Sequence, residues 1–457
     1  MLVQDSGQAA TPIRLVAPDA VDAWSSSLTD IARAWIERAG FAGRAGQSAW
    51  LPGSTGEPEV VVVGTGDGAG IATLGDLARQ LSEGDYRLHT DLAPEHRRRV
   101  LLGWGLGAYR FERYRKEDRE PARLLVPPDD AVVLDELDAV HWCRDLVNTP
   151  AGDMLPHDLE REARAFADAC GAALEVTTGE ALLERRLRVI HAVGRASVSA
   201  PRLIDLQWGD PGHPRVTLIG KGVCFDSGGL DLKTAAGMRL MKKDMGGAAH
   251  VLGLAKLVVS QRMPISLRVL VPAVENAVAG NAYRPGDVLQ AYDDTTIEID
   301  NTDAEGRLIL CDAIGLARGE DPELIVDFAT LTGAARVALG TELPAMFATD
   351  DAVADGIAAA GRRAEDPVWR MPLHAPYRRL LDSKVADLVN APETPFGGAI
   401  TAALFLAHFV GDIPWVHFDV MAWNQRARPA HPVGGEAMGL RAVYRYLEAR
   451  YGTAGGT

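Results

Sequence analysis

Residues 218–251 read LIGKGVCFDSGGLDLKTAAGMRLMKKDMGGAAHV. An apolar strand ends at Gly220, a glycine-rich loop follows, and the segment closes with a helix that includes Asp244. Glycine accepts backbone conformations that other residues resist, so this loop can turn sharply where the strand ends. In open α/β sheets, ligands bind beside loops at the carboxyl ends of strands. We therefore predict an α/β fold whose functional site is built on this loop.

Strand-like and helix-like patterns alternate along the rest of the chain. We expect strands at residues 12–16, 59–64, 86–90, 203–208, 215–220, 266–273, 324–329 and 415–420. We expect helices at residues 71–84, 94–109, 159–170, 238–260, 304–319, 397–410 and 437–450. Strands separated by helix-length segments predict a sheet with helices on both faces. The predicted fold class is α/β, with two domains that each hold a central mixed β-sheet flanked by helices in three layers.

The length of 457 residues is enough for two or three domains. An N-terminal α/β domain is predicted at residues 1–126. Residues 127–150 are predicted to form a connecting helix, because a Pro-Pro pair precedes its helical spacing and Pro150 ends it. A larger C-terminal domain is predicted at residues 151–457.

Composition restricts the partners and the compartment. The formal net charge of −15 argues against nucleic acid or an anionic membrane as the main partner, and we interpret the basic cluster at 97–99 as a solvated helix face. No apolar run approaches the roughly 20 residues of a membrane span. The four cysteines lack C-x-x-C spacing, which favours a reducing compartment. The first residues lack a signal-peptide pattern, and we expect a cytoplasmic protein.

Lysine usage points to the same loop. Of 47 Lys and Arg residues only seven are lysines, and four of these seven fall within residues 221–243. A lysine can act as a neutral amine, whereas arginine keeps its proton. We therefore assign a chemical role to Lys221 and Lys233, and we interpret Lys242 and Lys243 as a surface pair.

Four carboxylates accompany these lysines. The sequence NTDAEGRLIL at 301–310 carries Asp303 and Glu305, and the loop region carries Asp226 and Asp244. Converging carboxylates repel one another unless cations are present. Divalent ions such as Mg²⁺, Mn²⁺ and Zn²⁺ suit oxygen-rich sets, and a pair of such ions is a recurring hydrolytic arrangement. Taken one at a time, each of these acids could equally be a surface or capping residue.

Several motifs resemble those of the leucyl aminopeptidase (cytosol aminopeptidase) family. The segments that carry the resemblance are GKGVCFDSGG (220–229), LK (232–233), MKKDMGGAA (241–249) and NTDAEGR (301–307). Supporting segments are RDLVNTPAGDMLP (144–156), ATLTGAARVALG (329–340), SKVADLVN (383–390) and GAITAALFLAHFV (398–410). The motifs occur in the family's order over about residues 140–420. The resemblance implies a catalytic C-terminal domain and a variable, macro-domain-like N-terminal domain.

The resemblance implies two divalent metal ions bound side by side, Mn or Zn, with Mg or Co also compatible. Asp226 and Glu305 would bridge both ions. Lys221 and Asp244 would complete the tighter site, and Asp303 would complete the more exchangeable one. Lysine is a rare ligand that binds only as the free amine, and two nearby dications would depress its pKa.

The resemblance also implies a reaction, which is metal-dependent removal of the N-terminal residue, leucine or another, from peptides by a water activated between the metals. The scissile carbonyl would be polarised by a metal and by Lys233, and Arg307 would hold a bicarbonate ion that passes a proton to the leaving amine. Substrate-binding positions would be Met241, Thr330, Leu331 and Gly333, although Met241 could equally be a core residue. Family members form homohexamers, and we expect one here.

Two departures and two alternatives remain open from the sequence. The family usually has Ile-Ser-Ile before the catalytic lysine, whereas this chain has Asp231 at the middle position, which would favour a basic substrate residue or a different metal. The polar segment 421–440 is longer than in animal members and is expected to border the site. One alternative function is a DNA-binding or regulatory scaffold of the same family. The other is nucleotide binding through the glycine loop at 60–70, which we interpret as a packing turn.

Overall fold

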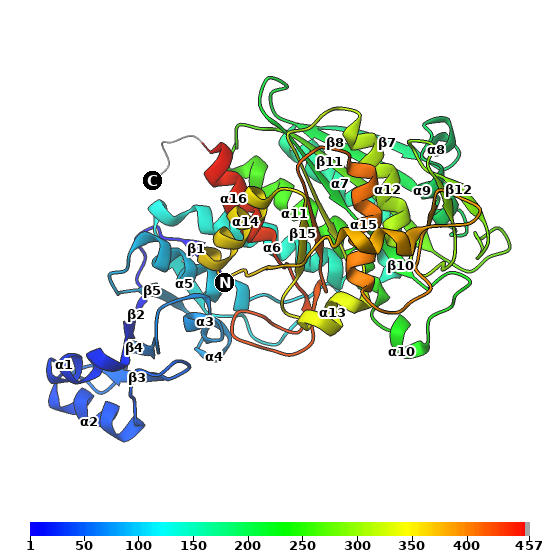
Figure 1. Cartoon of the computed structure of the whole chain (residues 1–457). Coiled ribbons are helices and arrows are strands. Elements are labelled where there is room, and N and C mark those ends of the chain that lie inside the picture. The colour runs from blue at the N-terminus through cyan, green and yellow to red at the C-terminus, as the bar shows by residue number, and fades with distance from the viewer. Residues whose placement is uncertain (453–457) are drawn as a thin grey trace. The chain divides into compact units, whose positions relative to one another are not determined.

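The computed structural model describes residues 1–452. The chain forms two compact units (Figure 1). The first unit contains Met1–His141 together with Arg426–Val433. The second contains Trp142–Gln425 and the described residues from Gly434 onward. Among the described residues, no helix is both long and apolar enough to cross a membrane.

The first unit is a mixed sheet with helices. Its strands are β1 (Leu2–Gln4), β2 (Thr11–Val16), β3 (Ser48–Pro52), β4 (Pro58–Gly64), β5 (Asp85–Leu88) and β6 (Arg123–Val126), in the order β1-β6-β5-β2-β4-β3. All neighbours are parallel except β3 and β4. The α-helices that lie wholly or partly in this unit are α1 (Val21–Ser26), α2 (Asp30–Ala39), α3 (Ile71–Leu74), α4 (Leu77–Gln80), α5 (Pro94–Gly107) and α6 (Val132–Asn148).

Two expectations for this unit are wrong. The helix expected at 71–84 is two short helices, α3 and α4, which are separated at Gly75, where a Cβ would lie 2.4 Å from the Ala430 nitrogen. The basic cluster at 97–99 is not simply a solvated face. Arg97 donates a hydrogen bond to the buried carboxylate of Asp130, which also pairs with Arg98.

The second unit contains a nine-stranded mixed sheet within the described residues. The strands are β7 (Ala173–Thr178), β8 (Arg202–Trp208), β9 (Arg215–Gly220), β10 (Gly222–Asp226), β11 (Ser266–Asn276), β14 (Leu324–Ala329), β15 (Ala345–Ala348), β16 (Trp369–Arg370) and β18 (Trp415–Asp419). Their order is β16-β15-β18-β14-β9-β11-β8-β7, with β10 paired to β11. The central strands β18, β14, β9 and β11 are mutually parallel. Their carboxyl ends therefore meet at one edge of the sheet.

The helices of the second unit pack on this sheet. The longer ones are α7 (Pro156–Cys170), α11 (Gly246–Ser260), α12 (Glu305–Arg318), α14 (Asp351–Ala364), α15 (Gly398–Val410) and α16 (Leu440–Tyr451), and the shorter ones are α8 (Ala181–Glu184), α9 (Arg188–Gly194), α10 (Ala235–Met238) and α13 (Gly333–Leu339). Helix α12 contacts α9 and α15, and apolar residues of all three share a core with Ile219 and Leu270 of the sheet. Helix α11 packs on β9 and β14 and contacts α16, which also contacts α14 (Figure 1). The predicted fold class, α/β with mixed sheets flanked by helices, is confirmed.

Shorter strands complete this unit. β12 (Val288–Gln290), β13 (Thr296–Glu298) and β17 (Leu388–Val389) form one small sheet, and β19 (Trp423–Asn424) pairs with β20 (Gly434–Gly435). The five strands expected from residue 203 onward are present as β8, β9, β11, β14 and β18. The helix expected at 238–260 is interrupted. Residues Met241–Met245 form a 3₁₀ turn, and the regular helix α11 begins only at Gly246.

Candidate metal centre

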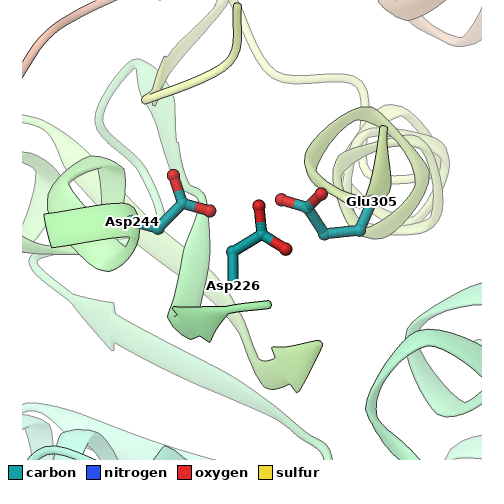
Figure 2. A group of neighbouring side chains, drawn as sticks. All are labelled: Asp226, Asp244 and Glu305. Carbon is teal, nitrogen blue, oxygen red and sulfur yellow. The ribbon is translucent and has the colours of Figure 1, made fainter. Parts of the chain in front are cut away.

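Three carboxylates from different elements meet at the carboxyl ends of the central strands. Asp226 is the last residue of β10, Asp244 lies in the 3₁₀ turn Met241–Met245, and Glu305 is the first residue of α12. Figure 2 shows the three side chains pointing toward one another from the strand end, the turn and the helix. One oxygen from each lies within 4.8 Å of the others, and all three residues are buried.

Lys221 completes this cluster on one side. It follows β9 directly, and its Nζ lies 2.8 Å from Asp244 Oδ2 and 2.8 Å from Glu305 Oε1. The same ammonium donates a hydrogen bond to the carbonyl of Thr330, 2.9 Å away. A Cβ on Gly306 would lie 2.6 Å from Cε of Lys221, so only glycine fits beside this side chain.

Lys233 and Asp303 lie on the more open side of the cluster. The Nζ of Lys233 is 2.7 Å from Asp226 Oδ2 and also pairs with Asp303. The side chain of Asp303 is 34% exposed, whereas that of Glu305 is 1% exposed. Ion pairs therefore connect the five predicted ligands and the predicted catalytic Lys233 in two groups, which meet at the cluster of three carboxylates. Asp303 is the nearest of these ligands to solvent.

Burial and like charge disturb the acidities at this site. Burial, together with the charge of Asp244, raises the pKa of Asp226 to about 6. Burial and the charge of Asp226 also raise the pKa of Glu305 well above its ordinary value. For Asp244 burial acts in the same direction, but the ammonium of Lys221 outweighs it and lowers the pKa. The positive charge near these three buried carboxylates is therefore too small for all of them to ionise at their ordinary pKa values.

The pKa of Lys221 is controlled by the carboxylates around it. Burial acts to lower this pKa, but the charges of Asp244 and Glu305 outweigh it and raise the pKa above the ordinary value. A lysine in these surroundings is an ammonium. Binding through the free amine would require additional positive charge at the cluster.

The donor set fits a divalent cation. Among the residues described, Oε2 of Glu305 is buried and has no hydrogen-bond partner, whereas Oε1 lies 2.8 Å from the ammonium of Lys221. A buried carboxylate oxygen without a donor is costly unless a cation neutralises it. Carboxylate oxygens are ligands that Mg²⁺, Mn²⁺ and Zn²⁺ accept.

Arg307 provides a buried positive charge in the first turn of α12. One of its terminal nitrogens donates to the carbonyl of Asn390, 2.7 Å away, and burial lowers the pKa of Arg307 to about 10. Within residues 1–452, its Nε has no hydrogen-bond partner. An arginine whose donors are not all used can hold an anion.

The predicted substrate-binding residues lie on the loop after β14 and beside the cluster. Thr330 Oγ1 donates to Asp244 Oδ1 at 2.7 Å, and Met241 is buried next to that acid in the 3₁₀ turn. The backbone N–H of Leu331 donates to Asp419, 3.0 Å away. Gly333 begins α13.

The sequence did not predict the surroundings of Lys242, Lys243 and Asp419. Lys243 is not a surface residue but is buried, because the 3₁₀ turn directs it inward, and burial lowers its pKa to about 8. Lys242 is half-buried, lies over the ring of Trp423 and donates to the carbonyl of Asn148. Asp419 accepts hydrogen bonds from two successive backbone N–H groups at the start of α13. No signal in the sequence singled out Asp419, since a lone acid at the end of a strand is ordinary.

Comparisons with known proteins agree with this geometry. The model of the cytosol aminopeptidase family, catalytic domain, matches residues 141–444, and that of the M17 aminopeptidase N-terminal domain matches residues 11–127. A protein of Xanthomonas campestris pv. campestris named "Probable cytosol aminopeptidase" is 40% identical over 396 residues, which are 81% of this chain and 80% of that protein.

Solved structures give the same result. A cytosol aminopeptidase from Coxiella burnetii, solved at 1.8 Å, superposes with a TM-score of 0.95 and 48% identity over 98% of this chain and 99% of that chain. The bottromycin maturation enzyme BotP in complex with Mn superposes with a TM-score of 0.87 and 35% identity, over 97% of this chain and 100% of that chain. The names of these matches describe peptidases or a maturation enzyme and do not favour the DNA-binding or nucleotide-binding alternatives.

Proposed function

This chain belongs to the cytosol aminopeptidase family, whose members are hydrolases, and we propose that it is a metal-dependent aminopeptidase of broad specificity that uses two divalent ions. One observation carries the proposal. Three buried carboxylates, those of Asp226, Asp244 and Glu305, converge within 4.8 Å, and the described residues leave Oε2 of Glu305 without a hydrogen-bond partner. Such a cluster is stable only with additional positive charge.

The ligands we propose are Asp226 and Glu305 for both ions, Lys221 and Asp244 for the tighter site, and Asp303 for the exchangeable site. The ion pairs from Lys221 to Asp244 and Glu305 support a shared position for these groups. The greater exposure of Asp303 supports easier exchange on its side. Manganese or zinc suits this set, and manganese is further supported by the Mn complex of BotP.

When bound, two divalent ions would supply an activated water at neutral pH and polarise the scissile carbonyl. The residues of the chain provide the rest of the chemistry. Burial alone would lower the pKa of Lys233, but the charge of Asp226 outweighs it and raises the pKa, so the side chain stays an ammonium. It can therefore donate to the oxygen on which negative charge develops.

Arg307 is the proposed site for a bicarbonate ion. Its buried guanidinium has one nitrogen without a partner among residues 1–452, which supports anion binding beside Glu305. A bicarbonate held there would carry the proton to the leaving amine. Thr330, Leu331 and Gly333 would line the position of the substrate, and Met241 would contact its first side chain.

The expected partners are peptides with a free amino terminus. We also propose a cytoplasmic location and a homohexamer. The net charge of −15 supports the absence of nucleic acid from the partners.

The experiment is hydrolysis of leucine-containing dipeptides with Mn²⁺ added or removed by EDTA. We expect release of the N-terminal residue with Mn²⁺, loss of release with EDTA, and none from the N-acetylated dipeptide. Lys233→Ala should retain Mn²⁺ binding and lose most of kcat, by about 100-fold or more, whereas Asp244→Asn should lose both. Cleavage that is insensitive to EDTA, or equal cleavage of the acetylated peptide, would contradict the proposal.

A further inference from the structure

Asp231 and Thr302 form a reciprocal pair of hydrogen bonds between two loops. The backbone N–H of Thr302 donates to Asp231 Oδ2 at 2.7 Å, and the N–H of Asp231 donates to Thr302 Oγ1 at 2.9 Å. The Thr302 hydroxyl lies 2.7 Å from the carbonyl oxygen of Gly228 and 3.1 Å from Asp231 Oδ2, either of which can accept its proton. Thr302 is fully buried, whereas Asp231 is exposed.

The two loops joined in this way carry the residues of the proposed site. The loop of Asp231 runs from Asp226 to Lys233, and Thr302 directly precedes Asp303. The loops are in contact as well as hydrogen-bonded. Gly228 has φ +89, and a Cβ there would lie 3.0 Å from Asp303 Oδ1. A displacement of either loop would therefore move Lys233 relative to Asp303.

The rest of the environment of Thr302 is fixed by other elements. Its carbonyl accepts from Asn276 Nδ2 at 3.0 Å and from the hydroxyl of Tyr283 at 2.6 Å. The same Asn276 nitrogen donates to Asp226 Oδ1 at 2.9 Å. These hydrogen bonds anchor Thr302 to the end of β11, and Asp231 connects the loop of Lys233 to Thr302.

We propose that Asp231 is a positioning residue, which sets the loop of Lys233 against Asp303 through Thr302 and does not select basic substrates. This proposal rests on the proposed function. The sequence suggested that the charge of Asp231 favours a basic substrate residue or a different metal. In the structure, the carboxylate oxygen Oδ2 instead accepts from the backbone N–H of Thr302 and lies 3.1 Å from the hydroxyl of the same residue.

The two roles predict different effects of conservative substitution. Both donors of Thr302 reach the same oxygen, so the amide oxygen of Asn can replace it without the charge. Asp231→Asn should keep kcat and Mn²⁺ affinity near the wild-type values. Asp231→Ala removes the acceptor and should lower kcat and Mn²⁺ affinity by about 10- to 100-fold, as removal of outer hydrogen-bond partners of metal sites does. KM should change little, because no substrate contact is lost.

The experiment compares wild type, Asp231→Ala, Asp231→Asn and the control Asp355→Ala, an exposed acid on α14. Peptide hydrolysis gives kcat and KM for substrates with N-terminal Leu and Arg, and electron paramagnetic resonance gives the free Mn²⁺ in a titration. Melting temperatures should be similar across the set, since Asp231 is exposed and its removal opens no core cavity. Thr302→Val combined with Asp231→Ala should cost less than the sum of the two single effects.

Three results would overturn the inference. In the first, Asp231→Ala is unaffected in both kcat and Mn²⁺ affinity. In the second, Asp231→Asn is as impaired as Asp231→Ala. In the third, both variants change mainly the ratio of Arg to Leu hydrolysis, which is the signature of a charge effect on the substrate. If wild type does not cleave peptides, the proposed function fails, and the Mn²⁺ titration alone decides whether Asp231 positions the site.

Discussion

At the scale of single residues, the pairing of buried charges matters both at the metal centre and among polar residues of the sheet. His417 on β18 donates through Nδ1 to Asp327 Oδ1 at 2.6 Å, and Trp415 Nε1 donates to the other oxygen of Asp327 at 2.6 Å. All three residues are fully buried. Burial alone would lower the pKa of His417, but the charge and hydrogen bond of Asp327 outweigh it and raise the pKa.

This pair makes stability depend on pH. A histidine whose pKa is raised by folding stabilises the protein fully below its unfolded pKa of about 6.5, and that contribution is lost as the pH rises through the folded pKa. His417→Asn should therefore cost about 3 kcal/mol of unfolding free energy at pH 6 and less at pH 9. Urea unfolding at both pH values measures the difference, with exposed His213→Asn as the control. An equal cost at both pH values would show that His417 is neutral in the fold.

Individual residues also show which features of the site could not be predicted from the sequence. The motifs located the acids that the structure brings together, because Asp226, Asp244 and Glu305 each lie where a strand, turn or helix meets the same sheet edge. The burial of Lys243 and the hydrogen bonds of Asp231 were not predictable. Both depend on which way a side chain points in an irregular turn, and this direction has no period in the sequence.

At the scale of elements, helix α12 approaches the end of β9 closely at the site. Gly306 in the first turn of α12 faces the side chain of Lys221, which follows β9. At an ordinary helix position, Gly→Ala would stabilise by about 1 kcal/mol. Here a Cβ would lie 2.6 Å from Lys221 Cε and 2.8 Å from its Nζ, so the sign should reverse.

We predict that Gly306→Ala destabilises the protein by about 1–3 kcal/mol through overpacking and weakens Mn²⁺ binding by displacing Lys221. Gly319→Ala, at the exposed end of the same helix, is the matched control because its nearest contact would be 3.4 Å. Thermal unfolding and a Mn²⁺ titration are the measurements. A Gly306→Ala protein that is more stable and binds Mn²⁺ normally would show that the close approach is unimportant.

Elements were predicted well where the sequence pattern was long and regular. The central strands and helices α5, α7, α12 and α15 lie close to their expected ranges. The failures were at 71–84, where the helix is broken between α3 and α4, and at 238–260, where a 3₁₀ turn carries Asp244. Hydrophobic spacing does not encode such interruptions, because tertiary contacts impose them.

At the scale of the whole molecule, the proposed assembly has a direct measurement. Several large apolar side chains of the second unit are exposed, with Val337 at 90% and Phe396 at 80%. Burial of such residues between copies of the chain would stabilise an oligomer. We predict a homohexamer of about 290 kDa from chains of 48.9 kDa, measured by size-exclusion chromatography with light scattering. A mass near that of one chain at micromolar concentration would contradict the hexamer.

The central claim is that the cluster of Asp226, Asp244 and Glu305 holds divalent ions. The most direct test is anomalous diffraction at the manganese edge from crystals of the wild-type protein grown with Mn²⁺. The account predicts two anomalous peaks, both in contact with Asp226 and Glu305, one also near Lys221 and Asp244 and the other also near Asp303. The absence of any peak at these carboxylates, with manganese present in the crystal, would contradict it.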